Sequence, residues 1–185
     1  RDWSVTGVQT CALPISPTVF RWTTSNGACA TTNDDVTTNV DALPTTAAAG
    51  GDQTLCNVTT ATLAATPVTS GMGAWTEVTG PGTGDAGQSN NANATVSNLS
   101  ATTPTVFRWT TSNGVCASTN DDVTINVDAL PTTAVAGADQ TLCNVTTATL
   151  AATPVTSGMG AWTVVSGPGT VDAGQANNPN ATVSN

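Results

Sequence analysis

The chain is dominated by an internal repeat, because residues 17–98 recur without a gap as residues 104–185. Equivalent residues are 87 positions apart, as Trp22 and Trp109 are, and likewise Cys56 and Cys143. Only ten of the 82 aligned positions differ. Such an array constrains the fold more than any local pattern, since every unit must close the same core. We therefore expect a function that copies of one module perform together.

Residues 1–16 stand outside the repeat. The run from Val5 to Ile15 resembles the in-frame translation of a common short-read sequencing adapter, and residues 1–16 as a whole are unlike the equivalent repeat positions 88–103. We interpret residues 1–16 as an artefact and exclude them from the expected fold. The rest of the chain falls five residues short of two full repeats, so we expect an internal fragment of a longer array.

The composition removes most catalytic chemistry. The chain has no His, Lys or Tyr, and its acids are eleven Asp and Glu77. Without these residues a Ser-His-Asp triad, a Cys-His pair, a Schiff-base lysine or a His-bearing metal site cannot be assembled. We expect no enzyme and no cofactor.

The charge balance bears on possible partners. The net charge is −9, and Arg21 and Arg108 are the only cations outside residues 1–16. This balance argues against nucleic acid as a partner, because a phosphate backbone would be repelled. No apolar stretch approaches the roughly 20 residues of a membrane helix.

Within one repeat, short β-prone runs alternate with Gly, Pro and Asn, which is typical of a β-sandwich. Alternation along 123–127 places Val123, Ile125 and Val127 on one face, and the same rule assigns every Trp after residue 16 to the core. The same alternation places the Arg108 side chain on the solvent-exposed face. We expect it to form a surface ion pair with an Asp there, in preference to serving as part of a ligand-binding edge. The predicted strands are a split first strand at 45–50 and 53–55, then 59–65, 73–79, 94–99, 105–112 and 123–127.

The repeat predicts three domains. Residues 17–45 form the C-terminal part of one immunoglobulin-like repeat, 46–132 a complete repeat, and 133–185 the N-terminal part of a third. The linker 127–133 is short and contains Pro131, so neighbouring modules are expected to form a rod or fibre. The predicted fold class is all-β, with tandem immunoglobulin-like (PKD-like) sandwiches.

Three motifs carry a resemblance to a known group. They are Ala-Gly-Ala-Asp-Gln-Thr-Leu-Cys at 136–143, Trp-Thr-Val-Val-Ser-Gly-Pro-Gly at 162–169 and Phe-Arg-Trp-Thr-Thr-Ser-Asn-Gly-Val-Cys at 107–116. Together they resemble the PKD-like and Ig-like repeats of giant surface adhesins from Bacteroidetes-type bacteria. The resemblance implies an extracellular stalk or adhesin on the bacterial surface, whose partners are identical neighbouring repeats, a polysaccharide, or a host or abiotic surface.

The cysteines indicate disulfides. Cys29, Cys56, Cys116 and Cys143 occur two per repeat, and an even count in such a chain favours an oxidising, extracytoplasmic setting. One connectivity joins the first-turn cysteine of one module to the last-turn cysteine of the next. The other joins Cys56 to Cys116 inside one module. Both remain open at the level of sequence.

Four acids surround the predicted junction between modules: Asp121, Asp122, Asp128 and Asp139. They are candidate ligands for Ca²⁺, which takes oxygen ligands and would stiffen a rod. The alternative is a solvated loop in which Asp caps turns, and no spaced calcium-loop motif is present.

Two functional classes remain. The first is a structural repeat of an adhesin, stalk or filament that provides length and mechanical strength without catalysis. The second is a multivalent carbohydrate-binding array, which would require exposed Trp residues or Asn/Asp loops.

Overall fold

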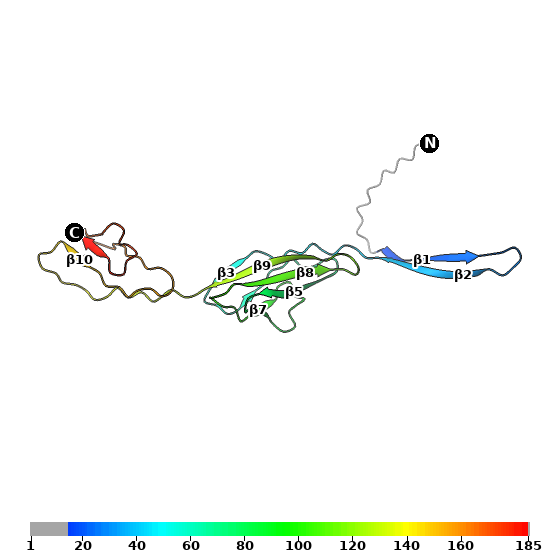
Figure 1. The fold of residues 1–185 in the computed structure, drawn as a ribbon, viewed down its shortest axis with the longest axis horizontal. Coiled ribbons are helices and arrows are strands. Elements are labelled where there is room, and N and C mark those ends of the chain that lie inside the picture. Colours follow the sequence, from blue (N-terminus) through cyan, green and yellow to red (C-terminus); the bar gives the residue numbers. More distant parts are fainter. Residues whose placement is uncertain (1–14, 185) are drawn as a thin grey trace, which may run out of the picture. The chain divides into compact units, whose positions relative to one another are not determined.

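The computed structural model describes residues 15–184, and every regular element in that range is a β-strand (Figure 1). The all-β prediction is therefore confirmed. None of the described residues belongs to a helix with the length and apolarity needed to cross a membrane. The strands are β1 (Ile15–Thr24), β2 (Thr32–Val40), β3 (Gln53–Cys56), β4 (Ala61–Thr62), β5 (Met72–Thr79), β6 (Thr83–Gly84), β7 (Thr95–Ser97), β8 (Thr105–Ser112), β9 (Thr119–Asp128), β10 (Thr147–Thr149), β11 (Thr170–Val171) and β12 (Thr182–Ser184).

The central sandwich comprises residues 45–128 and contains two sheets. The larger sheet has the strand order β3-β9-β8-β5, and the smaller has the order β4-β7-β6. β8 is antiparallel to both of its neighbours, pairing Trp109 with Trp75 of β5 and with Asp121 of β9. Because side chains alternate along β8, Phe107 and Trp109 share the face that packs on the smaller sheet.

The core of the sandwich is small and aromatic. The indoles of Trp75 and Trp109 lie with ring centroids 5.0 Å apart at an interplanar angle of 48°, a tilted geometry that aromatic pairs favour. The largest fully buried side chains are Trp109, Phe107, Leu63, Ile125, Val96 and Val123, with the hydroxyls of Thr105 and Thr111.

The predicted strand at 45–50 is wrong. In the structure this segment has no regular ladder, because its amide groups bond to side chains of β9. The Ala47 N–H donates to Thr119 Oγ1 and the Ala49 N–H to Asp121 Oδ2, each at 2.8 Å. Of the strand expected at 59–65, only β4 is a regular strand. The amides of Leu63 and Ala65 nevertheless donate to the carbonyls of Ala94 and Ala92, in the segment before β7.

Residues before the central sandwich form an antiparallel hairpin of β1 and β2, whose register repeats that of β8 and β9. Its charged pair is also repeated, since Arg21 Nε donates to Asp35 at 2.7 Å. Every described side chain of the hairpin from residue 17 to 40 is exposed. Of the segment interpreted as an artefact, Ile15 and Ser16 lie within β1, and residues 1–14 lie outside the described residues.

The described chain forms two compact units: the residues up to Thr54 together with Val58–Asn126, and Leu55–Asn57 together with the residues from Val127 to Ser184. The second unit has a three-stranded sheet of order β10-β12-β11. We refer to residues 132–184 as the open unit. Its segments 140–143 and 159–166, equivalent to β3 and β5, carry no assigned strand.

Candidate functional site: the acidic strand, the cysteines and two open faces

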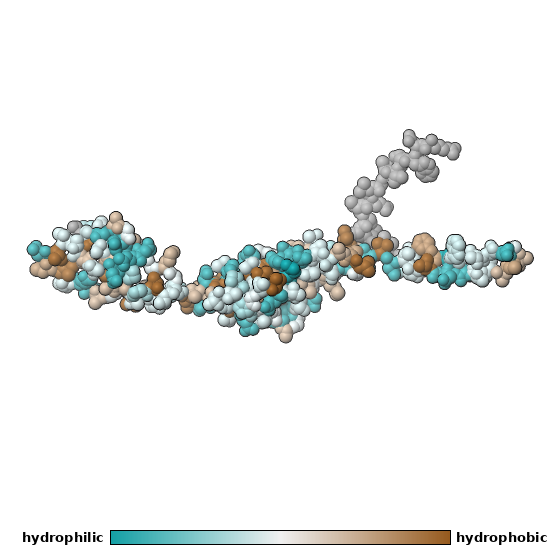
Figure 2. Space-filling model, in the orientation of Figure 1, coloured by the Kyte–Doolittle hydropathy of each residue, from teal (hydrophilic) through white to brown (hydrophobic). Residues whose placement is uncertain are grey.

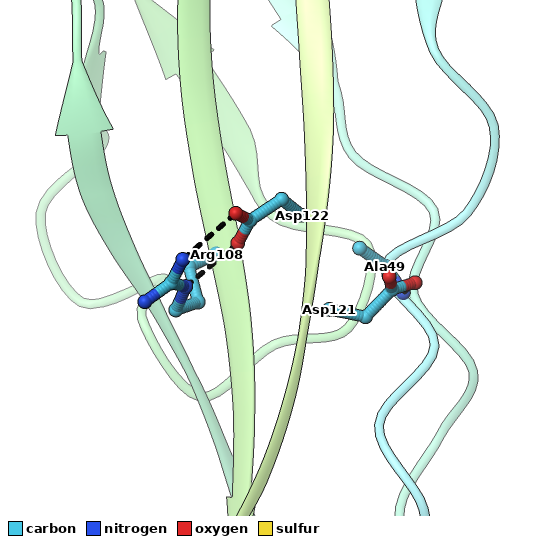
Figure 3. Close-up of polar contacts among 4 residues, drawn as sticks. All are labelled: Ala49, Arg108, Asp121 and Asp122. Carbon is cyan, nitrogen blue, oxygen red and sulfur yellow. Dashed lines mark hydrogen bonds and ion pairs between the residues drawn. The ribbon is translucent and has the colours of Figure 1, made fainter.

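Two adjacent aspartates of β9 have different partners (Figure 3). Asp122 accepts two hydrogen bonds from Arg108 of β8, at 2.7 and 2.8 Å. The neighbouring Asp121 lies on the other face of the strand and accepts the Ala49 N–H at 2.8 Å. The predicted outward pairing of Arg108 with an Asp is confirmed.

Arg108 and Asp122 affect each other's protonation. The hydrogen bonds from the guanidinium lower the pKa of the Asp122 carboxyl, and those same bonds raise the pKa of Arg108. Both side chains are 40% exposed, so water screens the pair. An exposed ion pair of this kind adds little to stability, because each charge is already well solvated in the unfolded chain.

The first segment of the sandwich runs parallel to β9 and is bonded to it along its length. Ala47 bonds to Thr119, Ala49 to Asp121 and Asp52 to Thr124, and every pair is separated by 72 residues. The Asn57 N–H then donates to the Asp128 carbonyl at 2.8 Å, where β9 ends. A constant separation means that the first and last segments run in the same direction.

The four acids proposed for Ca²⁺ are not gathered by the structure. Asp121 and Asp122 point to opposite faces of β9, while Asp128 and Asp139 are exposed. No group of three or more Cys, Asp or Glu side chains suited to a metal ion occurs between residues 15 and 184. The calcium site stays a prediction without a geometric basis in these residues.

All four cysteines predicted to form disulfides are free thiols. Cys56 precedes Asn57, which bonds to Asp128 at the end of β9, whereas Cys116 lies in the turn before β9 and its thiol donates to the Asp41 carbonyl at 3.4 Å. The ten residues of β9 span roughly 30 Å, and bonded cysteines need Cα atoms within about 7 Å. This arrangement does not favour a Cys56–Cys116 bond.

Only the complete sandwich buries its tryptophans as predicted. Trp109 is 1% exposed and Trp75 7%, but Trp22 of the hairpin is 76% exposed. The assignment of Trp22 to a core is therefore wrong in this chain, because no described segment packs over that face of the hairpin. Trp162 of the open unit is half-buried.

The open unit has a cavity of about 280 Å³ whose lining includes Val135, Val155, Met159, Gly160 and Trp162. Gly160 corresponds to Gly73 of the central sandwich. There the ring of Trp109 lies directly over the glycine, so close that a Cβ would overlap it. The cavity thus occupies the position that Trp109 and its strand fill in the complete module.

The sequence analysis did not identify the structural contacts of two aspartates, Asp52 and Asp85. Asp52 accepts the Thr124 N–H at 2.8 Å. Asp85 accepts hydrogen bonds from the hydroxyl of Ser97 and, at 2.6 Å, from that of Thr95, and these bonds lower the pKa of its carboxyl. The only signal in the sequence is that both recur in the second repeat, as Asp139 and Asp172.

Comparisons with known proteins add fold likeness only. No family model and no curated protein matches the chain. Among solved structures, it is similar to the PKD domain from the KIAA 1837 protein, with 24% identity, 45% of this chain and 85% of that chain covered, and a TM-score of 0.38.

Two longer structures also match. Drosophila OTK extracellular domains 3–5 match with 12% identity, 72% of this chain and 47% of that chain covered, and a TM-score of 0.35. The N-terminal eight Ig domains of Down Syndrome Cell Adhesion Molecule isoform 1.30.30 match with 13% identity, coverage of 91% and 26%, and a TM-score of 0.40.

Proposed function

We propose that this chain is a structural repeat of an extracellular bacterial surface adhesin, stalk or filament, in which each sandwich adds length and resists tension. The observation that carries the proposal is the parallel bonding of the first segment to β9. The chain enters the sandwich at Thr45, whose carbonyl accepts the Thr111 hydroxyl, and leaves at Asp128, at the far end of β9.

Tension along the array would act on this pairing as shear. When the entry and exit of parallel segments are pulled apart, all the bonds between them bear the load together. These bonds join Ala47, Ala49 and Asp52 to β9. Forced unfolding is governed by the barrier to unfolding, so this arrangement favours a high unfolding force.

Single-molecule stretching of the chain tests the mechanical part of the proposal. The unfolded chain of the central sandwich, residues 45–128, should span roughly 290 Å at about 3.4 Å per extended residue, and stretching should release this length less the end-to-end distance of the folded module. Asp121→Ala should lower the peak force, because the Ala49 amide loses its partner, whereas Asp122→Ala, which breaks only the surface pair, should leave it unchanged. Equal peak unfolding forces for the two variants would contradict the shear model.

The proposed location has its own test. Two cysteines per repeat support an oxidising compartment, and an antibody against residues 45–128 should label intact source cells. Labelling only after permeabilisation would contradict a surface role. The alternative, a multivalent carbohydrate-binding array, would need exposed aromatic platforms, and burial of Trp75 and Trp109 in the complete module gives it little support. Glycan-array binding by the purified chain would favour it.

A further inference from the structure

We propose that Asn113 is a self-modification site of the module: the bound linker protects its carboxamide from deamidation, and deamidation prevents the linker from binding again. We call residues 41–44 the entry linker, because they lead into the central sandwich, and residues 113–116 the β8–β9 turn. The inference does not depend on which repeats precede or follow in the array, nor on the extracellular role.

The β8–β9 turn holds the entry linker through three side-chain or backbone donors. The Asn113 carboxamide donates through Nδ2 to the Ala42 carbonyl at 2.9 Å. The Val115 N–H donates to Asp41 Oδ2 at 3.0 Å, and the Cys116 thiol donates to the Asp41 carbonyl at 3.4 Å. Two consecutive linker residues are therefore bonded to one turn.

Ser70 connects the linker to the same carboxamide. Its hydroxyl donates to the Leu43 carbonyl at 2.8 Å and accepts a hydrogen bond from Asn113 Nδ2 at 3.3 Å. Of the larger apolar residues of the linker, Pro44 is buried but Leu43 is 76% exposed. Figure 2 shows mostly neutral to hydrophilic surface over the central sandwich. Hydrogen bonds, with the Asn113 carboxamide at their centre, thus position the linker.

Asn113 is followed by Gly114, and the chain has one other Asn-Gly pair, Asn26-Gly27. In such a pair the glycine nitrogen can attack the side-chain carbonyl carbon of the asparagine, because no Cβ obstructs the approach. A bond forms between that nitrogen and that carbon, the bond from the carbon to Nδ2 breaks, and Nδ2 leaves as ammonia with the proton of the glycine amide. Water then opens the resulting succinimide at either carbonyl to give aspartate or isoaspartate.

The linker contacts oppose the first step of this reaction. For the Gly114 nitrogen to reach the side-chain carbonyl carbon, the Asn113 carboxamide must turn toward its own backbone. Its hydrogen bonds to Ala42 and Ser70 hold it away from that orientation. Attack therefore requires local opening, and its rate follows the fraction of time that the linker is detached.

Deamidation replaces the donor that the linker needs with an acceptor. An ionised carboxylate has no hydrogen to donate, and at position 113 it would face the Ala42 carbonyl oxygen. It would also lie in the turn whose Val115 amide binds the Asp41 carboxylate, and two negative charges at close range repel each other. Both effects favour the detached linker, so the modification makes a reversible release permanent.

Asn26 is a matched reference in the same chain. The glycine after it has a φ of 54°, against 53° for Gly114. The backbone hydrogen bond that closes the turn is 3.0 Å from Cys29 to Asn26 and 3.1 Å in the β8–β9 turn. The positions equivalent to Ala42 and Ser70 fall before residue 1, so this chain presents the same turn once with its linker and once without it.

Deamidation at the two sites is compared during incubation of the chain at neutral pH. Trypsin cleavage at Arg21 and Arg108 places Asn26 and Asn113 in different fragments, and fragment-ion mass spectrometry locates the change. In urea the two rates should be equal. In the folded chain Asn113 should react about tenfold more slowly, as expected for a linker detached about a tenth of the time. Equal rates in the folded chain, or no reaction at either site, would overturn the proposal.

Variants of the linker contacts test the cause of the protection. Asp41→Ala removes the acceptor of the Val115 amide, and Ser70→Ala removes a partner of the Asn113 carboxamide. Each should raise the rate at Asn113 toward that at Asn26. Asp122→Ala, which breaks only the surface ion pair with Arg108, is the matched control and should leave both rates unchanged. If neither linker variant accelerates the reaction, the linker is not the protecting group.

Asn113→Asp tests the consequence of deamidation. Hydrogen exchange measured by NMR should be at least about tenfold faster at the Val115 amide, which binds Asp41, and at the Thr45 amide, which donates to the Ser70 carbonyl at 3.0 Å. Asn26→Asp makes the same change in the β1–β2 turn and should leave both amides as they were. Unchanged exchange in Asn113→Asp, or equal acceleration in the two variants, would contradict the release of the linker.

Discussion

Gly73 lies under the indole of Trp109, and the space between β5 and β8 leaves no room for a side chain there. The glycine therefore sets how closely the two strands and their tryptophans pack. This requirement is steric, because Gly73 is not among the glycines with positive φ.

We expect Gly73→Ala to lower the free energy of unfolding by about 1–3 kcal/mol, the usual cost of overpacking a core. Urea unfolding followed by tryptophan fluorescence measures the change. Gly51→Ala, where a Cβ meets nothing within 4 Å and the other repeat carries Ala138, should leave the unfolding midpoint in place, and an equal loss in both variants would show that packing against Trp109 is not the cause.

Asn57 has a left-handed backbone conformation, with φ of 49°, and Asn144 repeats it with φ of 53°. This turn redirects the chain after the segment that runs along β9. Asparagine tolerates the conformation better than other residues with a Cβ, because its short polar side chain can hydrogen-bond locally, and glycine tolerates it best.

Asn57→Ala should therefore destabilise the sandwich by about 1 kcal/mol, because a Cβ without a local polar partner is strained there. Asn57→Gly should be close to neutral. Thermal unfolding followed by circular dichroism compares the two variants, and an Asn57→Gly variant less stable than Asn57→Ala would contradict this account.

At the scale of the element, Asp85 links the end of β6 to β7 through the hydroxyls of Ser97 and Thr95. These bonds stabilise the ionised carboxylate and lower its pKa. In the unfolded chain the pKa returns to about 3.9, so the unfolded state binds more protons than the folded state as the solution is acidified.

Stability should thus be constant from pH 7 to about pH 5 and should fall below about pH 4, as the pH approaches the lowered pKa of folded Asp85. Asp85→Asn should flatten part of this acid dependence. Urea midpoints at pH 7, 4 and 3 measure both effects. If Asp85→Asn retains the full acid loss, other carboxylates, such as Asp122 beside Arg108, are responsible.

Strands with clean alternation could be predicted from sequence. The predicted range 105–112 matches β8, and the inward set Val123, Ile125 and Val127 is buried. The segment 45–50 was mispredicted because its amides are satisfied by side chains 72 residues away, a relation that no local pattern contains. The exposure of Trp22 has a similar cause, since alternation identifies an inward face but not whether a second sheet covers it.

At the scale of the whole molecule, the contacts of one repeat could be predicted from those of the other, whereas the residues of a ligand site could not. The ion pair of Arg108 and Asp122 recurs at Arg21 and Asp35 with the same 2.7 Å distance. The calcium candidates failed to gather because adjacent residues of a strand point to opposite faces, which separates Asp121 from Asp122.

Arg21 and Arg108 are also the only points after Arg1 at which a trypsin-like protease can cut. Arg108 lies in the middle of β8, paired on both sides, whereas Arg21 lies in a two-stranded hairpin. Brief digestion followed by mass spectrometry should therefore show cleavage at Arg21 before Arg108. Faster cleavage at Arg108 would mean that β8 opens more readily than the hairpin.

Each repeat carries a single arginine and no lysine. In the closed module that arginine lies in a strand paired on both sides, so cleavage there requires opening of the sandwich. A surface polymer built from such modules would persist among secreted trypsin-like proteases. How fast each module is cut there would follow the fraction of time its sandwich is open, when reclosing is faster than cleavage.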